Sequence, residues 1–159
     1  MEVIMKKKIL AAVFTDNMVF QRDKAVKLFG NVAAGRQVTI DFNNLTVSAT
    51  ADDNGYWETE LAPMSAAVNL SLTAVCGEDK VVLNNIAIGE VWLAGGQSNM
   101  EFELQNDKNG AQALAECADE NVRFYYTPKC EMTDDKLISA ENASRWDMPS
   151  AENSRAWSA

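Results

Sequence analysis

The sequence predicts a β domain followed by the start of an α/β domain, and three observations support this. Apolar and polar residues alternate over several short segments of the first half, the pattern of antiparallel strands with one buried face. After Gly89 the alternation gives way to a continuous apolar run, as expected of a parallel strand covered on both faces. A helical stripe and a further strand follow, the order of a βαβ unit. We therefore expect a multidomain β plus α/β protein, with an antiparallel β-sandwich over residues 1–88 and an incomplete, truncated α/β domain over residues 89–159.

The first half supplies the strands of the predicted sandwich. An apolar run over residues 9–14 is read as a first strand, because it lacks the cleavage site that would make it the remnant of a secretory signal. Alternating residues then predict three more strands, over residues 37–42, 47–51 and 68–74. Short strands at this spacing are typical of a small β-sandwich.

Turn-forming residues separate these strands. They lie at residues 31–35 and again at residues 52–55, where Asn54-Gly55 predicts a hairpin because this pair tolerates positive φ. The acidic residues of 52–55 also allow a reading as a calcium loop. That reading lacks a further glutamate and the alternating ligands, so we favour the turn.

The second half begins with the apolar run Val91-Trp92-Leu93. Ala111, Leu114, Ala115 and Ala118 then lie at i, i+3, i+4 and i+7, which predicts an amphipathic helix that Asp107 or Asn109 caps. Residues 122–126 predict another strand. Because about two parallel strands cannot cover both their faces, we expect a longer natural protein and self-association through the uncovered sheet edge.

Composition restricts the partners and the compartment. The 159 residues carry a formal net charge of −9, so neither nucleic acid nor an anionic membrane is an expected partner. Cys76, Cys117 and Cys130 are odd in number and widely spaced, and the chain has no histidine to complete a zinc site. We expect free thiols, no metal and no cofactor. A cytoplasmic location is favoured, and a secreted or periplasmic one is the alternative.

The candidate site is the segment from Gly89 to Met100, which reads G-E-V-W-L-A-G-G-Q-S-N-M. An apolar run that ends at paired glycines and is followed by Ser98 is how a strand delivers a nucleophilic serine to the carboxyl edge of an α/β sheet. The alternative is a serine in a tight turn without chemistry. Gln97 and Asn99 flank it as candidates for substrate binding, unless they only hold the loop.

Three motifs together resemble the sialate O-acetylesterase family of SGNH (GDSL-like) hydrolases. They are Met18-Val19-Phe20-Gln21-Arg22-Asp23, Asp53-Asn54-Gly55-Tyr56-Trp57 and Gly96-Gln97-Ser98-Asn99-Met100. Further similar segments cover nearly the whole chain in the expected order. The resemblance implies a β-sandwich fused to a flavodoxin-like SGNH esterase domain, with an O-acetylated sugar or sialic acid as substrate.

The resemblance also implies a mechanism. Ser98 would attack the acetyl ester, and its backbone N–H would stabilise the oxyanion. The family's base is a histidine near the C-terminus, preceded by an aspartate, and the chain contains no histidine. Both residues are expected beyond Ala159, so this chain alone is predicted to be inactive. The alternative function is a non-catalytic carbohydrate-binding or interaction module with a vestigial hydrolase segment; a nucleotide binder is disfavoured because no glycine-rich phosphate loop is present.

Other conspicuous residues receive structural expectations. Arg22 is expected to form an ion pair between strands or domains, and Glu90 and Glu101 are expected to face solvent or to be structural. Four other large side chains are expected in the core: Trp57, Trp92, Met100 and Phe102. For Trp57 the alternative is stacking on a sugar ring, and for Met100 and Phe102 it is a position in a pocket.

Overall fold

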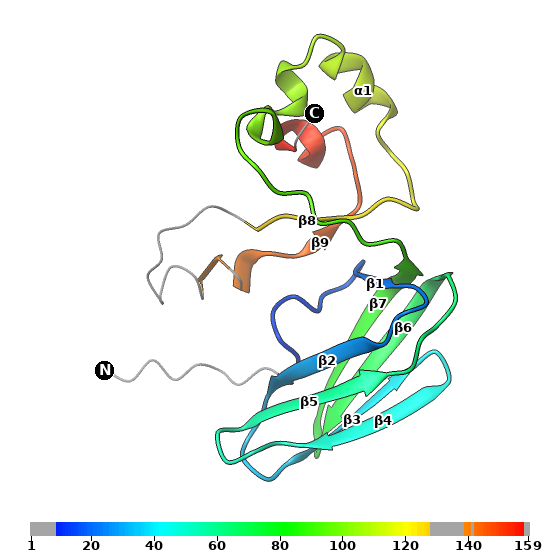
Figure 1. Ribbon diagram of the computed structural model, residues 1–159, viewed down its shortest axis with the longest axis vertical. Coiled ribbons are helices and arrows are strands. Elements are labelled where there is room, and N and C mark those ends of the chain that lie inside the picture. The colour runs from blue at the N-terminus through cyan, green and yellow to red at the C-terminus, as the bar shows by residue number, and fades with distance from the viewer. Residues whose placement is uncertain (1–8, 128–138, 141, 158–159) are drawn as a thin grey trace.

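A computed structural model describes residues 9–127, 139–140 and 142–157 (Figure 1). A β unit holds the strands β1 (Val19–Gln21), β2 (Val26–Asn31), β3 (Gln37–Phe42), β4 (Leu45–Thr50), β5 (Tyr56–Leu61), β6 (Ala67–Cys76) and β7 (Asp79–Gly89). A smaller upper lobe holds η1 (Ser98–Glu101), η2 (Leu104–Asn106), α1 (Gly110–Glu116), β8 (Phe124–Tyr125), β9 (Trp146–Asp147) and η3 (Asn153–Ala156).

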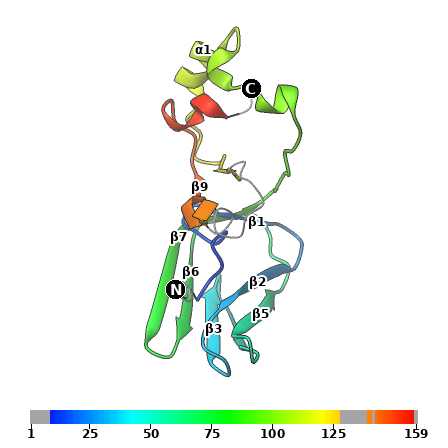
Figure 2. The ribbon, with the colours of Figure 1, turned by 90° about the vertical axis from the view of Figure 1, so that its left-hand side faces the viewer.

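The β unit has two layers. One is a mixed sheet in the order β1-β7-β6-β3-β4, in which β1 runs parallel to β7 and the other pairs are antiparallel. The other is the antiparallel pair β2-β5, which lies across the face of the first sheet (Figure 2). The described fold is therefore mostly β, which agrees with the predicted β part of the chain. Its main sheet is mixed, whereas the sequence predicts antiparallel strands there.

The core lies between the two layers. Val38, Ile40 and Phe42 of β3 are buried, while Gln37 and Asp41 are exposed, so the predicted alternation is confirmed. The predicted strands at 47–51 and 68–74 correspond to β4 and β6. The facing layer contributes Leu28 and Trp57, and each such buried side chain stabilises the fold by roughly 1.5–3 kcal/mol.

The segment at residues 9–14 is not a strand. Ile9 and Leu10 are buried but have no strand conformation. The segment lies beside β2, and the Ala11 N–H donates to the Phe29 carbonyl at 3.0 Å. The Trp57 indole Nε1 donates to the Ile9 carbonyl at 2.8 Å. These apolar residues are thus buried by packing against β2 and β5 without forming a strand. Hydrophobicity alone cannot distinguish such packing from strand pairing.

Two asparagine-containing turns differ from expectation. The predicted turn at residues 52–55 is present, with Gly55 at φ 84° and the Asp52 carboxylate accepting from the N–H groups of Asn54 and Tyr56 at 2.9 Å. It connects β4 to β5 in the other layer and closes no hairpin. The two-residue hairpin lies instead at Asn43 and Asn44, both at positive φ, between β3 and β4.

The predicted buried strand at Val91-Trp92-Leu93 is wrong for this structure. β7 ends at Gly89, and residues 90–97 form no strand. Trp92 is 86% exposed and Leu93 is fully exposed. An apolar run becomes a buried strand only when neighbouring strands cover it, and none of the described elements does so.

The upper lobe confirms the predicted helix but not the βαβ pairing. α1 spans Gly110–Glu116. Of the predicted apolar stripe, Leu114 is buried, whereas Ala111 and Ala115 are exposed and Ala118 is exposed beyond the helix. The predicted strand at 122–126 is present as β8, which pairs antiparallel with β9 instead of parallel with the segment before Ser98. No helix in the described part of the chain is long and apolar enough to cross a membrane.

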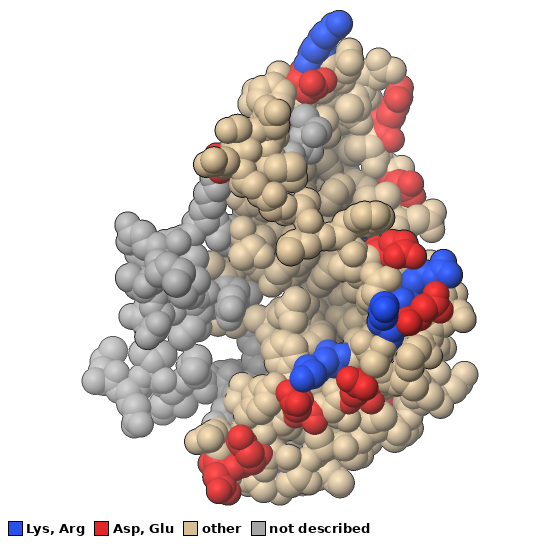
Figure 3. Space-filling view, viewed as in Figure 1, with Lys and Arg blue, Asp and Glu red and all other residues tan. Residues whose placement is uncertain are grey.

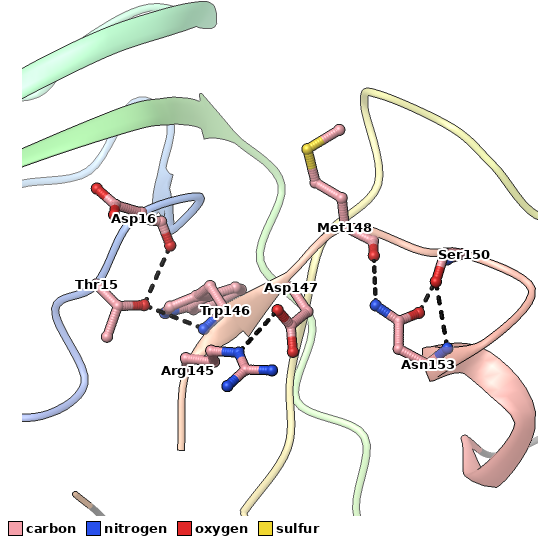
Figure 4. Close-up of polar contacts among 8 residues, drawn as sticks. All are labelled: Thr15, Asp16, Arg145, Trp146, Asp147, Met148, Ser150 and Asn153. Carbon is pink, nitrogen blue, oxygen red and sulfur yellow. Dashed lines mark hydrogen bonds and ion pairs between the residues drawn. The ribbon is translucent and has the colours of Figure 1, made fainter. Parts of the chain in front are cut away.

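The segment around β9 fastens the upper lobe to the β unit (Figure 4). The Trp146 N–H donates to the Thr15 hydroxyl at 3.1 Å, and its indole donates to the Val13 carbonyl at 3.1 Å. The Asn153 side chain closes the following turn by donating to the Met148 carbonyl at 2.8 Å. The two contacts of Trp146 join segments 131 and 133 positions apart in the sequence.

Candidate active site

The segment that carries Ser98 leaves the β unit between β1 and β7. The Gln21↔Gly89 pair ends the parallel ladder, and the Arg22 N–H then donates to the Gly89 carbonyl at 2.8 Å. The Gln21 side chain continues the pairing, because its Oε1 accepts from the Val91 N–H at 2.9 Å. The start of the segment is thus held by a main-chain hydrogen bond to Gly89 and by a side-chain hydrogen bond to the next residue but one, Val91.

Charged side chains surround this exit. Arg22 Nε lies 2.8 Å from an Asp23 carboxylate oxygen and 3.7 Å from one of Glu90. The hydrogen bond to Asp23, followed by the charges of Asp23 and Glu90, raises the pKa of Arg22. The expected ion pair is therefore present, but its partners are exposed and it adds little stability. Glu90 also accepts from Gln21 Nε2 at 3.1 Å, so its expected solvent-facing, structural role is confirmed.

Ser98 is exposed and begins the short helix η1 with φ 57°, in the left-handed region. Gln97 before it is extended, with φ −133° and ψ −176°. The turn closes when the Met100 N–H donates to the Gln97 carbonyl at 3.2 Å. A serine at positive φ in a tight turn is strained, and such strain is concentrated at functional sites.

No described residue forms a contact that would identify it as a base for Ser98. No hydrogen bond joins its hydroxyl to another described residue, and the sequence has no histidine. Gln97 and Asn99 are exposed beside it, and the Asn99 carbonyl accepts from the Phe102 N–H at 3.2 Å. The catalytic role of Ser98 and the substrate-binding roles of Gln97 and Asn99 stay predictions.

The large apolar residues near Ser98 lie outside the core, contrary to expectation. Met100 is 39% exposed and Phe102 is 44% exposed. Met100 packs on the backbone of Gly96, where an added Cβ would lie 2.9 Å from Met100 Cγ. Trp57, by contrast, is 1% exposed and fills the core, which excludes sugar stacking on its ring.

The cysteines behave as predicted where they are described. Cys76 is buried in β6, Cys117 is half-buried after α1, and both are free thiols. Cys130 lies outside the described residues. Among the described residues, no three His, Cys, Asp or Glu side chains are grouped so that they could hold a metal ion.

Sequence reasoning missed two cavities. One is lined by residues of the upper lobe that include Tyr126, Arg145 and Trp157. The other lies between the lobe and the β unit and includes Asn85 and Arg123. Ser98 lines neither. The only local signal for the second was the pair Asn84-Asn85, because asparagine adopts positive φ readily. These two residues lie in β7, a strand that the sequence reading did not predict.

The surface charges are mixed on the face that Figure 3 shows. Basic side chains lie beside acidic ones. Among the described residues, Lys27 forms an exposed ion pair with Glu58 at 3.3 Å. No basic patch stands out on this face of the described residues, in keeping with the net charge of −9.

The chain is similar in structure to a carbohydrate acetylesterase from Xanthomonas citri. The TM-score is 0.85 and the sequences are 25% identical over 96% of this chain. This chain spans 34%, about a third, of the length of that enzyme. No protein-family model matches the sequence, and no curated protein is similar enough to count as a relative. The two proteins therefore share a fold over nearly all of the residues of this chain.

Proposed function

We propose that this chain supplies the β domain and the nucleophile of a carbohydrate O-acetylesterase. The observation that carries the proposal is the fold shared with the Xanthomonas citri carbohydrate acetylesterase over 96% of the chain. The strained, exposed serine at the start of η1 adds independent support, because a nucleophile must reach the substrate. The resemblance of the segment around Ser98 to sialate O-acetylesterases points to the same chemistry.

In this proposal, Ser98 Oγ attacks the carbonyl carbon of an acetyl ester on a sugar. The sugar oxygen leaves with a proton, the acetyl group stays on Ser98, and water then releases acetate. The Ser98 N–H stabilises the oxyanion of each tetrahedral intermediate. A base must accept the proton of the Ser98 hydroxyl. Since the chain contains no histidine, we propose that this base comes from outside this polypeptide.

A chimera tests the proposal. The chain is joined to the part of the Xanthomonas citri esterase that it does not cover, and acetate release from acetylated sugars, including O-acetylated sialic acid, is followed by NMR. We expect turnover that falls by about 10⁴-fold or more in the Ser98→Ala chimera. Equal turnover with and without the Ser98 hydroxyl, in chimeras of matching near-ultraviolet circular dichroism, would refute the role of Ser98.

One observation favours a second function. A polar cavity lies between the β unit and the upper lobe, away from Ser98. Because binding a sugar in such a cavity requires no base, the non-catalytic carbohydrate-binding module is the alternative.

A further inference from the structure

The cavity between the β unit and the upper lobe is partly open to solvent and has a volume of about 240 Å³. Polar side chains from both parts line it: Asn69, Asn85, Glu120, Asn121 and Arg123. Interfaces between two parts of a protein are preferred places for small-molecule sites. The volume is below the range of about 300–1,000 Å³ for drug-sized ligands, so a single sugar ring is a suitable occupant.

Two irregular strands form one wall. Asn69 in β6 has φ 57°, and Asn85 in β7 has φ 54°. The β6–β7 register shifts on both sides of Leu70, next to Asn69 and opposite Ile86. Such irregularities redirect side chains, and they are over-represented beside binding sites. Here they place two amide side chains of neighbouring strands at one cavity.

Arg123 of the upper lobe also lines the cavity, in contact with Asn85, and only neutral groups among the described residues hold it. Its Nη1 donates to the Glu120 carbonyl at 2.8 Å, and its Nη2 donates to Asn85 Oδ1 at 3.3 Å. Its Nε is shielded from solvent and has no partner. Of the five guanidinium N–H groups, these two bonds therefore leave three without a described acceptor. Burial lowers the pKa of Arg123, and no carboxylate among the described residues pairs with it.

The acceptor of Arg123 is itself fixed. Asn85 Nδ2 donates to Asn17 Oδ1 at 2.8 Å and lies 3.3 Å from the Met148 sulfur. These contacts orient the amide so that its oxygen meets the guanidinium. The cation is thus positioned before any ligand binds, which reduces the entropy cost of binding.

We propose that this cavity binds a sugar that carries a carboxylate, such as a uronic acid residue. The carboxylate takes the second N–H groups of Arg123 Nη1 and Nη2, which suit a planar, two-oxygen acceptor. The amides of Asn69 and Asn121 serve the sugar hydroxyls, and Val68 and Met148 offer apolar contact to the ring. Glu120 is exposed and also lines the cavity, and its negative charge lowers the affinity for an anionic sugar. The inference does not depend on Ser98 or on hydrolysis.

Binding of two matched sugars to the full chain tests the proposal. Methyl glucuronoside and methyl glucoside differ only in the carboxylate, and both are titrated by NMR at millimolar concentrations. We expect the acid to bind about tenfold tighter or more, as a charge-assisted hydrogen bond implies. Equal affinity for the two sugars, or no binding of either, would overturn the proposal.

Variants locate the site. Arg123→Met should abolish the preference for the acid, Arg123→Lys should retain part of it, and Arg155→Met, at an exposed arginine outside the cavity, should leave it intact. Glu120→Gln should raise the affinity for the acidic sugar severalfold and leave the affinity for the neutral sugar unchanged. An unchanged preference in folded Arg123→Met, checked by circular dichroism, would contradict the assignment. If that variant does not fold, the Glu120→Gln comparison decides.

Discussion

The Gln21 side chain binds the backbone of Val91, with Oε1 accepting the Val91 N–H at 2.9 Å. Its Nε2 donates to the Glu90 carboxylate at 3.1 Å, so one amide holds two successive residues. It thereby carries the β1–β7 pairing past the last ladder pair, Gln21↔Gly89. Together with the bond from the Arg22 N–H to the Gly89 carbonyl, this contact holds the start of the Ser98 segment against β1.

Replacing Gln21 by alanine should loosen the exit of the segment without unfolding the β unit. The Val91 amide would lose its acceptor, so we expect it to exchange with solvent faster by at least about tenfold, the equivalent of a hydrogen bond of about 1.4 kcal/mol. Amide exchange by NMR measures this. Gln112→Ala on α1 is the matched control, and unchanged protection of Val91 in Gln21→Ala would show that the contact is not formed in solution.

The sequence predicted those strands whose apolar and polar residues alternate along the chain. The alternation of Val38, Ile40 and Phe42 identified β3 because one face of the strand is buried against the other layer and the opposite face is exposed. The same kind of reading failed at Trp92, since the burial of a continuous apolar run depends on neighbouring strands that local sequence does not specify. Ser98 was identified from its flanking motif, and its exposure and strain agree with the proposed role.

Other features required contacts that are distant in sequence. The Asn54-Gly55 turn was predicted correctly as a turn, but turn chemistry does not say which layer the next strand joins. The Arg123 contact with Asn85 joins residues 38 positions apart, and no pattern in either segment indicates it. The cavity therefore became visible only in the folded structure.

Gly30 should not tolerate any side chain. It lies in β2 opposite Trp57, and a Cβ there would collide with the Ile9 backbone carbonyl. Because a main chain cannot yield as a flexible side chain does, we expect Gly30→Ala to lower the free energy of unfolding by about 1–3 kcal/mol. Urea unfolding measures the change. Gly95→Ala, at a position with open space around it, should stay within about 0.5 kcal/mol of the parent.

Two tryptophans should differ sharply when each becomes phenylalanine. Trp57→Phe leaves the buried Ile9 carbonyl without its donor and should cost about 1–3 kcal/mol of unfolding free energy. Trp92 is 86% exposed, so Trp92→Phe should change stability by less than about 0.5 kcal/mol. Equal losses in thermal and urea unfolding would mean that Trp92 is buried in solution.

The chain alone should hydrolyse p-nitrophenyl acetate no faster than its Ser98→Ala variant. A serine hydroxyl without a base is a poor nucleophile, and loss of triad members costs on the order of 10⁴- to 10⁶-fold in turnover. Release of p-nitrophenol, corrected for the buffer rate, measures this. Turnover that disappears in Ser98→Ala would show that another group of this chain serves as the base.

The Tyr56–Glu58 contact should couple two titrations on the surface of β5. The Tyr56 hydroxyl donates to the Glu58 carboxylate at 2.8 Å, and this bond, followed by the interaction with Lys27, lowers the pKa of Glu58. A carboxyl with a lowered pKa in the folded state stabilises the fold above its unfolded pKa, and this contribution is lost as the pH falls through the folded value. The same hydrogen bond raises the pKa of Tyr56, so its contribution is lost as the pH rises through that folded value.

Tyr56→Phe should therefore raise the pKa of Glu58 towards its ordinary value and leave only the lowering due to Lys27. Glu58→Gln should, in the same way, lower the pKa of Tyr56. NMR titration of the Glu58 carboxyl carbon measures the first shift, with Tyr126→Phe as the control at another exposed tyrosine. If the Glu58 carboxyl titrates identically in Tyr56→Phe and in the parent chain, the hydroxyl does not hold it in solution, and Lys27 alone must cause any lowering that is observed.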